Sequence, residues 1–398
     1  MREGNWIDGR WAAPRAGDVF EPELRPREGA ARDPWPRSSL VDLENALAGL
    51  ADGWPAWKRL GRRGRARVLL ERLDGWQRHA PGVDALALRL GLAHDDLDLE
   101  LERGLERGDR VLEGRGGRDE SGPVLVRVAG CELWEGLVGA VLGPLLGGVP
   151  VLLLGDRDLP HLAHEFVRAL VEPDPEHPLA SALALVHEDR SVCLEEALAS
   201  GDLARAWIPG RADPDAVTPI SGAAPRNASA VVLAGDDPLE RAAALAAAAF
   251  APVAALSGQR AGQLGRVFCH ERRLSAFTGA LLEQLEALST AGTCRPFVGD
   301  LGATCEGLVR LGLDEGATLI LGGPDGSAGF RGALRKGSVV PSVFTNVEPN
   351  MALARASRPA PVLSLVRLPS DAEAQAAVER ADRPGPPVQG LGDAPSVS

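Results

Sequence analysis

The amino-acid sequence predicts an α/β protein of two units, a Rossmann-like unit with a parallel sheet followed by a second α/β unit. Strand-like and helix-like segments alternate from residue 124 to residue 207, which is typical of parallel strands joined by crossover helices. The alternation resumes from residue 231 to residue 368. The 398 residues are 45% hydrophobic and 25% charged, which is the composition of a globular protein with a sizeable core.

In the first unit, each element follows from its apolar pattern. Residues 5–20 predict short strands with a turn at Asp8-Gly9. Apolar residues at helical spacing predict helices at 40–50 and 65–76, and one helix or a pair of helices over 86–111. Short, buried apolar runs then alternate with helical segments. The strands are predicted at 124–128, 151–154, 182–186 and 204–208, and the helices at 135–146, 159–171 and 195–199.

The second unit shows the same alternation. Strands are predicted at 231–233, 266–269, 318–321 and 362–368, and helices at 239–250, at 274–288 and within 299–316. We predict that the first unit spans residues 1–218 and the second unit residues 219–381. The tail at 382–398 is rich in proline, glycine and serine, which predicts a flexible segment.

One uncharged segment, residues 136–155, has the length of a membrane span. Its glycines, together with Pro144 and Pro150, would break a spanning helix. The segment divides better into a buried helix, a turn at Gly147-Gly148 and a buried strand, so no membrane span is predicted.

The charge balance and rare residue types exclude several functions. The net charge of −12 argues against a general binder of nucleic acids. Lys58 and Lys336 are the only lysines and tyrosine is absent. The composition therefore argues against a mechanism that uses a Schiff-base lysine or a tyrosine as general acid. The five cysteines form no CxxC pair and no secretory signal precedes them, which predicts a cytoplasmic protein.

No GxGxxG, Walker A, GxSxG or HExxH motif occurs in the sequence. His161 and His164 lie at a spacing that could serve a metal, but we interpret them as two partly exposed helix histidines and predict no metal site. Consecutive strand residues face opposite sides, so Cys269 is interpreted as a core residue and not as a partner of His270. Cys305, like Cys294, is expected in a loop, either as a reactive thiol or as a buried one.

Long segments resemble the NAD(P)-dependent aldehyde dehydrogenase superfamily. The segments are 341–355 (PSVFTNVEPNMALAR), 315–323 (EGATLILGG), 6–11 (WIDGRW), 54–57 (WPAW) and 143–148 (GPLLGG). The resemblance implies the fold of this family and runs from about Asn5 to about Ala381. The closing segment of the family, with a strand that joins subunits, has no counterpart. We therefore expect a truncated, degenerate member, with a degenerate dinucleotide-binding type of domain over residues 1–218 and a degenerate catalytic type of domain over residues 219–381.

The resemblance also implies that the catalytic groups are replaced. The family's nucleophilic cysteine lies two residues after a Gly-Gln pair, and here that position after Gly258-Gln259 is Ala261, whose methyl group has no lone pair. The asparagine that helps to hold the oxyanion corresponds to Glu132. No glutamate occurs between Glu196 and Glu240, the stretch that would carry the general base.

Cofactor-binding positions are altered as well. The family's lysine that meets the adenosine ribose corresponds to Gly155, and the glutamate and phenylalanine near the nicotinamide correspond to Ser357 and Pro359. Gly210 matches a glycine that lets the pyrophosphate approach a helix, and it is interpreted as a vestige. We expect no cofactor, with NAD or NADP as the alternative.

The resemblance therefore predicts a catalytically inactive protein, a structural or regulatory subunit in a homo- or hetero-oligomer with an aldehyde dehydrogenase family subunit. Two alternatives stay open. One is a residual NAD(P)-dependent aldehyde oxidoreductase that uses Cys131 or Cys294 as nucleophile. The other is a sensor that binds a ligand in the crevice between the domains without converting it.

Overall fold

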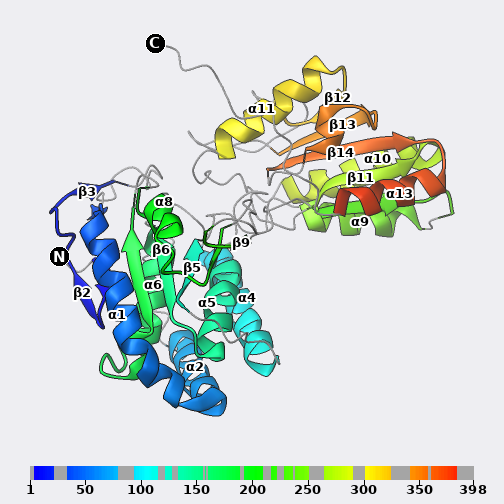
Figure 1. Ribbon diagram of the computed structural model, residues 1–398. Coiled ribbons are helices and arrows are strands. Elements are labelled where there is room, and N and C mark those ends of the chain that lie inside the picture. Colours follow the sequence, from blue (N-terminus) through cyan, green and yellow to red (C-terminus); the bar gives the residue numbers. More distant parts are fainter. Residues whose placement is uncertain are drawn as a thin grey trace, which may run out of the picture.

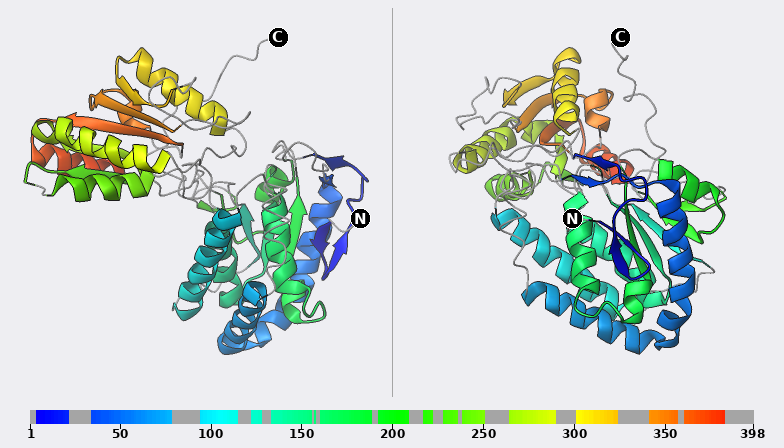
Figure 2. Two further views of the ribbon diagram at one scale, coloured as in Figure 1. Left: turned by 180° about the vertical axis from the view of Figure 1, so that it is seen from behind. Right: turned by 90° about the vertical axis from the view of Figure 1, so that its left-hand side faces the viewer.

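The computed structural model describes most of the chain. The described residues are 4–21, 34–78, 94–114, 122–127, 133–155, 157, 160–188, 192–208, 217–221, 228–235, 238–250, 264–289, 301–323, 341–356 and 360–382. Figures 1 and 2 show their helices and strands gathered around two sheets, the first coloured blue to green and the second yellow-green to red. The predicted tail at 382–398 lies almost wholly outside the described residues.

The first sheet has seven strands in the order β2-β1-β7-β6-β5-β8-β9. They are β1 (Asn5–Ile7), β2 (Arg10–Ala12), β5 (Val124–Arg127), β6 (Val151–Gly155), β7 (Leu183–His187), β8 (Arg205–Trp207) and β9 (Ile220–Ser221). The strands β5 to β9 run parallel, and β1 and β2 form an antiparallel hairpin that joins β7. The predicted parallel sheet is therefore present. Its last strand ends at Ser221, and the domain limits stay predictions.

Helices cover both faces of the first sheet. One face packs against α2 (Gly61–Arg78), α4 (His94–Glu113), α5 (Leu133–Gly147), α6 (Pro160–Val171) and α7 (Pro178–Ser181). The other face packs against α1 (Leu40–Arg59) and α8 (Val192–Ala199). Alternate residues of β6 and β7 point to opposite faces, as the strand period requires, and each face has its own apolar core.

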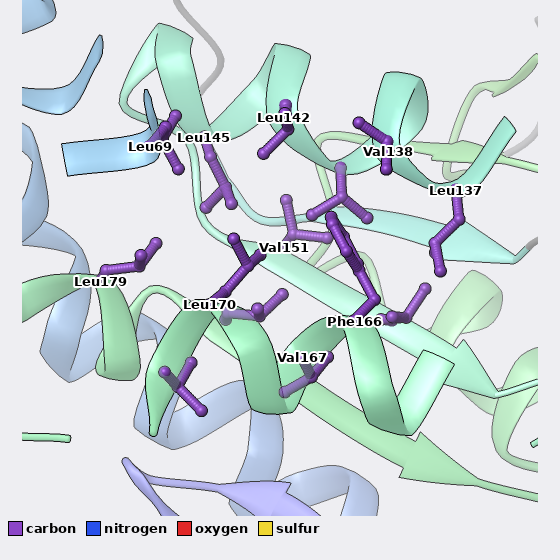
Figure 3. Packing of buried hydrophobic residues seen from close by; sticks show 14 of the residues in the cluster. Leu69, Leu137, Val138, Leu142, Leu145, Val151, Phe166, Val167, Leu170 and Leu179 are labelled. Atoms are coloured by element: carbon purple, nitrogen blue, oxygen red, sulfur yellow. The ribbon is translucent and has the colours of Figure 1, made fainter. Parts of the chain in front are cut away.

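The core between α5, α6 and β6 consists of buried aliphatic and aromatic side chains. Figure 3 shows Phe166 and Leu170 of α6 pointing toward Val151 of β6 and toward the side chains of α5. The uncharged segment thus forms a buried helix and a buried strand, as predicted, with Gly148 in the left-handed region at φ 83° between them. No helix in the described part of the chain has the length and apolar character needed to cross a membrane.

The second sheet has five strands in the order β10-β11-β14-β13-β12. They are β10 (Ala228–Val232), β11 (Leu264–His270), β12 (Thr318–Leu321), β13 (Ser342–Val347) and β14 (Val362–Leu368). The strand β12 runs antiparallel to β13, and the other neighbours are parallel. The strands β3 (Val19–Phe20) and β4 (Trp35–Pro36) pair with each other in a separate two-stranded sheet.

Helices cover both faces of the second sheet as well. One face packs against α9 (Leu239–Phe250) and α10 (Glu271–Ser289). The other packs against α11 (Leu301–Asp314), α12 (Ala352–Arg355) and α13 (Asp371–Asp382). Each sheet is therefore the middle layer of three, and the predicted α/β fold class is confirmed.

The tryptophans are confined to one part of the chain. All eight precede residue 208 and lie on the first sheet, on its helices or on β4. Trp6 donates from its indole nitrogen to the carbonyl oxygen of Ala180 at 2.8 Å, and Trp57 donates to that of Leu145 at 2.9 Å. These bonds let large rings be buried without leaving an N–H group unsatisfied.

Candidate functional site

The topology directs attention to the carboxyl edge of the first sheet. From β5 the chain moves to β6 and β7 on one side and then returns to β8 on the other side of β5. Open parallel sheets bind ligands outside the carboxyl ends of the strands at such a reversal. The residues that end the strands here are Arg127, Gly155, His187 and Trp207.

His187 occupies the space beside Gly155. The two residues are in register on the parallel strands β7 and β6, so a side chain on either would project from the same face. A Cβ atom built on Gly155 would lie 2.4 Å from Nδ1 of His187. His187 is fully buried, and burial together with the nearby His164 and His161 holds its pKa well below the ordinary value.

Trp35 packs against the imidazole of His187, and two tryptophans contact the histidines beside it. The ring centroid of Trp35 lies 4.8 Å from that of His187 and 4.7 Å from that of His161. The ring of Trp11 stacks on His164 at 4.4 Å with an interplanar angle of 30°. We call Trp11, Trp35, His161, His164 and His187 the tryptophan–histidine cluster. It joins the N-terminal strands to α6 and to the end of β7.

The cluster corrects one prediction. His161 and His164 are 9% and 5% exposed, so they are buried residues and not the partly exposed helix histidines that the sequence suggested. The reason is that Trp11 of β2 and Trp35 of β4 pack over α6, a contact that the spacing on the helix does not contain. Within the described residues, no three histidine, cysteine or acidic side chains are placed so that they could hold a metal ion.

The opposite face of the same edge carries an ion pair. Arg127 ends β5 and Glu188 follows β7, and their charged atoms lie 3.9 Å apart. Because β6 lies between β5 and β7, the Arg127 side chain must reach across the end of β6. Glu188 also accepts hydrogen bonds from the backbone N–H groups of Cys193 and Leu194 at 3.0 and 3.2 Å.

The carboxylate of Glu188 therefore stabilises the N-terminus of α8. Burial raises the pKa of Glu188, while Arg127 and the two N–H groups act in the opposite direction. A carboxylate at this position uses the anion-binding capacity of the helix N-terminus for the chain itself. The sequence analysis identified neither Arg127 nor Glu188, because partners 61 residues apart share no local pattern.

The catalytic positions inferred from sequence cannot be placed. Ala261, Glu132 and Gly210 lie outside the described residues, and so do Cys131 and Cys294. Ser357, Pro359 and the Gly-Gln pair at 258–259 also lie outside them. Gly155 is the one predicted cofactor position that the structure describes.

The other cysteines are all described, and none has an accessible thiol. Cys193, Cys269 and Cys305 are at most 1% exposed. Burial raises the pKa of Cys193 to about 12 and that of Cys305 to about 12, so neither forms a thiolate near neutral pH. Cys269 is a core residue of β11, as predicted, whereas Cys305 lies in helix α11 and not in a loop.

The signature segments hold elements of the second sheet and its helix α12 in contact with one another. Gly322, with φ 85°, lies so close to β13 that a Cβ atom would come within 2.2 Å of the Pro341 carbonyl oxygen. The carboxylate of Glu315 accepts hydrogen bonds from the N–H groups of Ala352 and Leu353 and thereby holds the start of α12. The signature thus fixes β12, β13 and α12 relative to one another.

Comparisons with known proteins agree with this fold. The chain matches a salicylaldehyde dehydrogenase from Pseudomonas putida G7, with a TM-score of 0.79 and 18% identity over 95% of this chain and 82% of that one. It also matches an NADP-dependent glyceraldehyde-3-phosphate dehydrogenase from Bacillus halodurans C-125 complexed with NADP, with a TM-score of 0.77 and 19% identity over 96% and 84%. No curated protein sequence matches the chain.

A third match is an aldehyde dehydrogenase from Pseudomonas syringae, crystallised as a cysteine-to-alanine mutant with NAD+ and octanal. Its TM-score is 0.76, with 19% identity over 94% of this chain and 82% of that one. The fold is thus that of the aldehyde dehydrogenases. Residues 217–383 also match the sequence model of the Aldehyde dehydrogenase family, and the predicted resemblance to this superfamily is confirmed.

The described part of the carboxyl edge does not fit a dinucleotide gripped at the end of β6. The resemblance implies a lysine at the position of Gly155, and the space for the first atom of any side chain there is taken by His187. The next strand ends in a buried imidazole and a buried carboxylate, Glu188, whose oxygens already contact Arg127 and α8.

Proposed function

We propose that the chain is a catalytically inactive protein with the aldehyde dehydrogenase fold, which acts as a structural or regulatory subunit beside an active relative in the cytoplasm. One observation carries the proposal: the position of the nucleophile holds Ala261 in the sequence. Oxidation of an aldehyde in this family needs a sulfur atom that forms a thiohemiacetal and then a thioester. The methyl group of alanine can form neither of these intermediates.

The burial of the described cysteines supports the same proposal. A substitute nucleophile would have to be an accessible thiol with a thiolate fraction near neutral pH. Cys193, Cys269 and Cys305 are buried in helical or strand cores, and the pKa values of Cys193 and Cys305 are raised to about 12. The residual-enzyme alternative therefore depends on Cys131 and Cys294.

We expect no aldehyde oxidation by the purified protein. With NAD+ or NADP+ and a panel of aldehydes that includes salicylaldehyde and octanal, NAD(P)H formation should stay at least about a thousandfold below that of an active aldehyde dehydrogenase assayed in parallel. Reduced cofactor that forms with the unaltered protein, and disappears in Cys131→Ser or Cys294→Ser, would establish the residual enzyme instead.

The subunit role is supported by the second sheet. In the described residues β12 pairs only with β13, so its other edge presents backbone groups that another chain can pair with. We expect the protein to form mixed oligomers with an active aldehyde dehydrogenase, which light scattering of the mixture and of each component will measure. A well-behaved monomer that stays unmixed would contradict the subunit role.

A ligand sensor is the second candidate. The Pseudomonas syringae structure contains NAD+ and octanal in a cysteine-to-alanine mutant, so this fold holds ligands when a cysteine has been removed. A sensor would bind such a ligand without turnover. Calorimetry with NAD+, NADP+ and aldehydes distinguishes a sensor from a subunit without a ligand.

A further inference from the structure

We infer that the chain fills the carboxyl edge of its own first sheet, with His187 on one face and the Arg127–Glu188 pair on the other, and holds no dinucleotide at the end of β6. The inference deepens the proposed function, because a protein closed in this way lacks an oxidant as well as a nucleophile. It concerns binding alone and can fail while the proposal of inactivity stands.

On the two neighbouring strands β6 and β7, a residue without a side chain lies beside a residue with a large one. Gly155 has no side chain, and its neighbour in register, His187, has a large one that takes the vacated space. The backbone of Gly155 is not in the left-handed region, so its conformation alone would accept an L side chain. The contact with His187 is therefore the feature that requires glycine at this position.

Moving His187 aside would break several contacts. Its imidazole lies in the tryptophan–histidine cluster, 4.8 Å from the Trp35 ring, and its backbone N–H donates to Oδ1 of Asn5 at 3.0 Å. The same Asn5 oxygen accepts from the hydroxyl of Ser38 at 3.0 Å. A ligand group that entered the space beside Gly155 would have to separate the His187 ring from Trp35 of β4, which also packs against His161 of α6.

On the opposite face of the edge, the start of α8 is bound by the carboxylate of Glu188. An anion that approached α8 would compete with the carboxylate of Glu188, which accepts hydrogen bonds from the N–H groups of Cys193 and Leu194 and lies 3.9 Å from Arg127. Glu188 is 3% exposed, so its carboxyl group is held in place by these contacts and does not extend into water. The N–H groups of Cys193 and Leu194, which could bind a phosphate at this place, already bind the chain's own carboxylate.

A double-mutant cycle tests the exchange of size. Gly155→Ala should lower the melting temperature by at least roughly 5 °C. In a His187→Ala background the same change should lower it little or not at all, because the colliding ring has been removed. Gly143→Ala is the matched control, since its Cβ atom would meet nothing within 4 Å, and its melting temperature should be unchanged or raised.

The cycle stays informative when one variant is poorly folded. If Gly155→Ala fails to fold and the double variant folds, the coupling is established in its strongest form. If Gly155→Ala is equally harmful in both backgrounds, His187 does not fill this space and the inference is wrong.

Equilibrium dialysis of the full chain with NAD+, NADP+ and adenosine monophosphate tests the consequence. We expect no saturable binding up to about 1 mM, the upper end of ordinary enzyme affinities. Saturable binding of any of the three overturns the inference. Binding without aldehyde oxidation would leave the proposed inactivity intact and favour the sensor, whereas oxidation of aldehydes would overturn the proposed function itself.

Discussion

Glu100→Gln will make the protein more stable than the unaltered chain at alkaline pH, by about 4 kcal/mol at pH 8.5. Glu100 lies in α4 with no exposed surface, and burial raises its pKa from 4.5 to about 8, against the opposing influence of Arg103. Between these values the unfolded chain has lost the proton and the folded chain still holds it. The free energy of unfolding therefore falls as the pH rises through this range, and a glutamine removes the penalty.

Thermal denaturation followed by circular dichroism at pH 5 and pH 8.5 measures the effect. The glutamine retains a carbonyl oxygen for Nη1 of Arg103, which lies 3.3 Å from Oε1 of Glu100. The control is Glu102→Gln, the same substitution at an exposed side chain of the same helix. If Glu100→Gln and the unaltered protein melt at the same temperature at pH 8.5, burial does not raise the pKa of Glu100 as described.

Phe166→Ala will lower the free energy of unfolding by about 3 to 5 kcal/mol. Phe166 has no exposed surface and lies between β6 and the helices α2 and α5, with its ring 5.3 Å from that of Trp76 (Figure 3). Truncation removes both the transfer energy of the ring and the packing of its neighbours. The measurement is a urea titration followed by circular dichroism.

The matched control for Phe166 is Leu70→Ala on α2, because Leu70 is an apolar residue of the same layer that is 40% exposed. Its replacement should change the free energy of unfolding by no more than about 0.5 kcal/mol. Similar losses in the two variants would mean that the core described for the first sheet does not determine its stability.

The fold class could be predicted because the strongest signals are local. The apolar run of α5, the buried run of β6 and the alanine-rich α9 each carry their period in consecutive residues, and all three were predicted close to their observed limits. The strand β13 and the helix α13 were not predicted. The first lies inside the signature segment, where loop-forming residues follow it closely, and the second is charged and weakly patterned.

The candidate site was predictable only where the resemblance supplied the positions. The family motifs identify Ala261, Glu132 and Gly155 as altered positions. They do not identify the residues that the structure places at the carboxyl edge, such as His187 and Glu188. His187 is 32 residues from Gly155, and Glu188 is 61 residues from Arg127, so each contact exists only once the strands are ordered in the sheet. The burial of His161 and His164 has the same origin, because Trp11 and Trp35 reach them from the N-terminal strands.

The distribution of tryptophans has a practical consequence for every unfolding experiment on this protein. Since all eight precede residue 208 and tyrosine is absent, intrinsic fluorescence reports on the first sheet and its surroundings alone. Circular dichroism records helices around both sheets. The interval between the fluorescence and dichroism midpoints therefore measures directly how far the two halves of the chain melt as separate cooperative blocks.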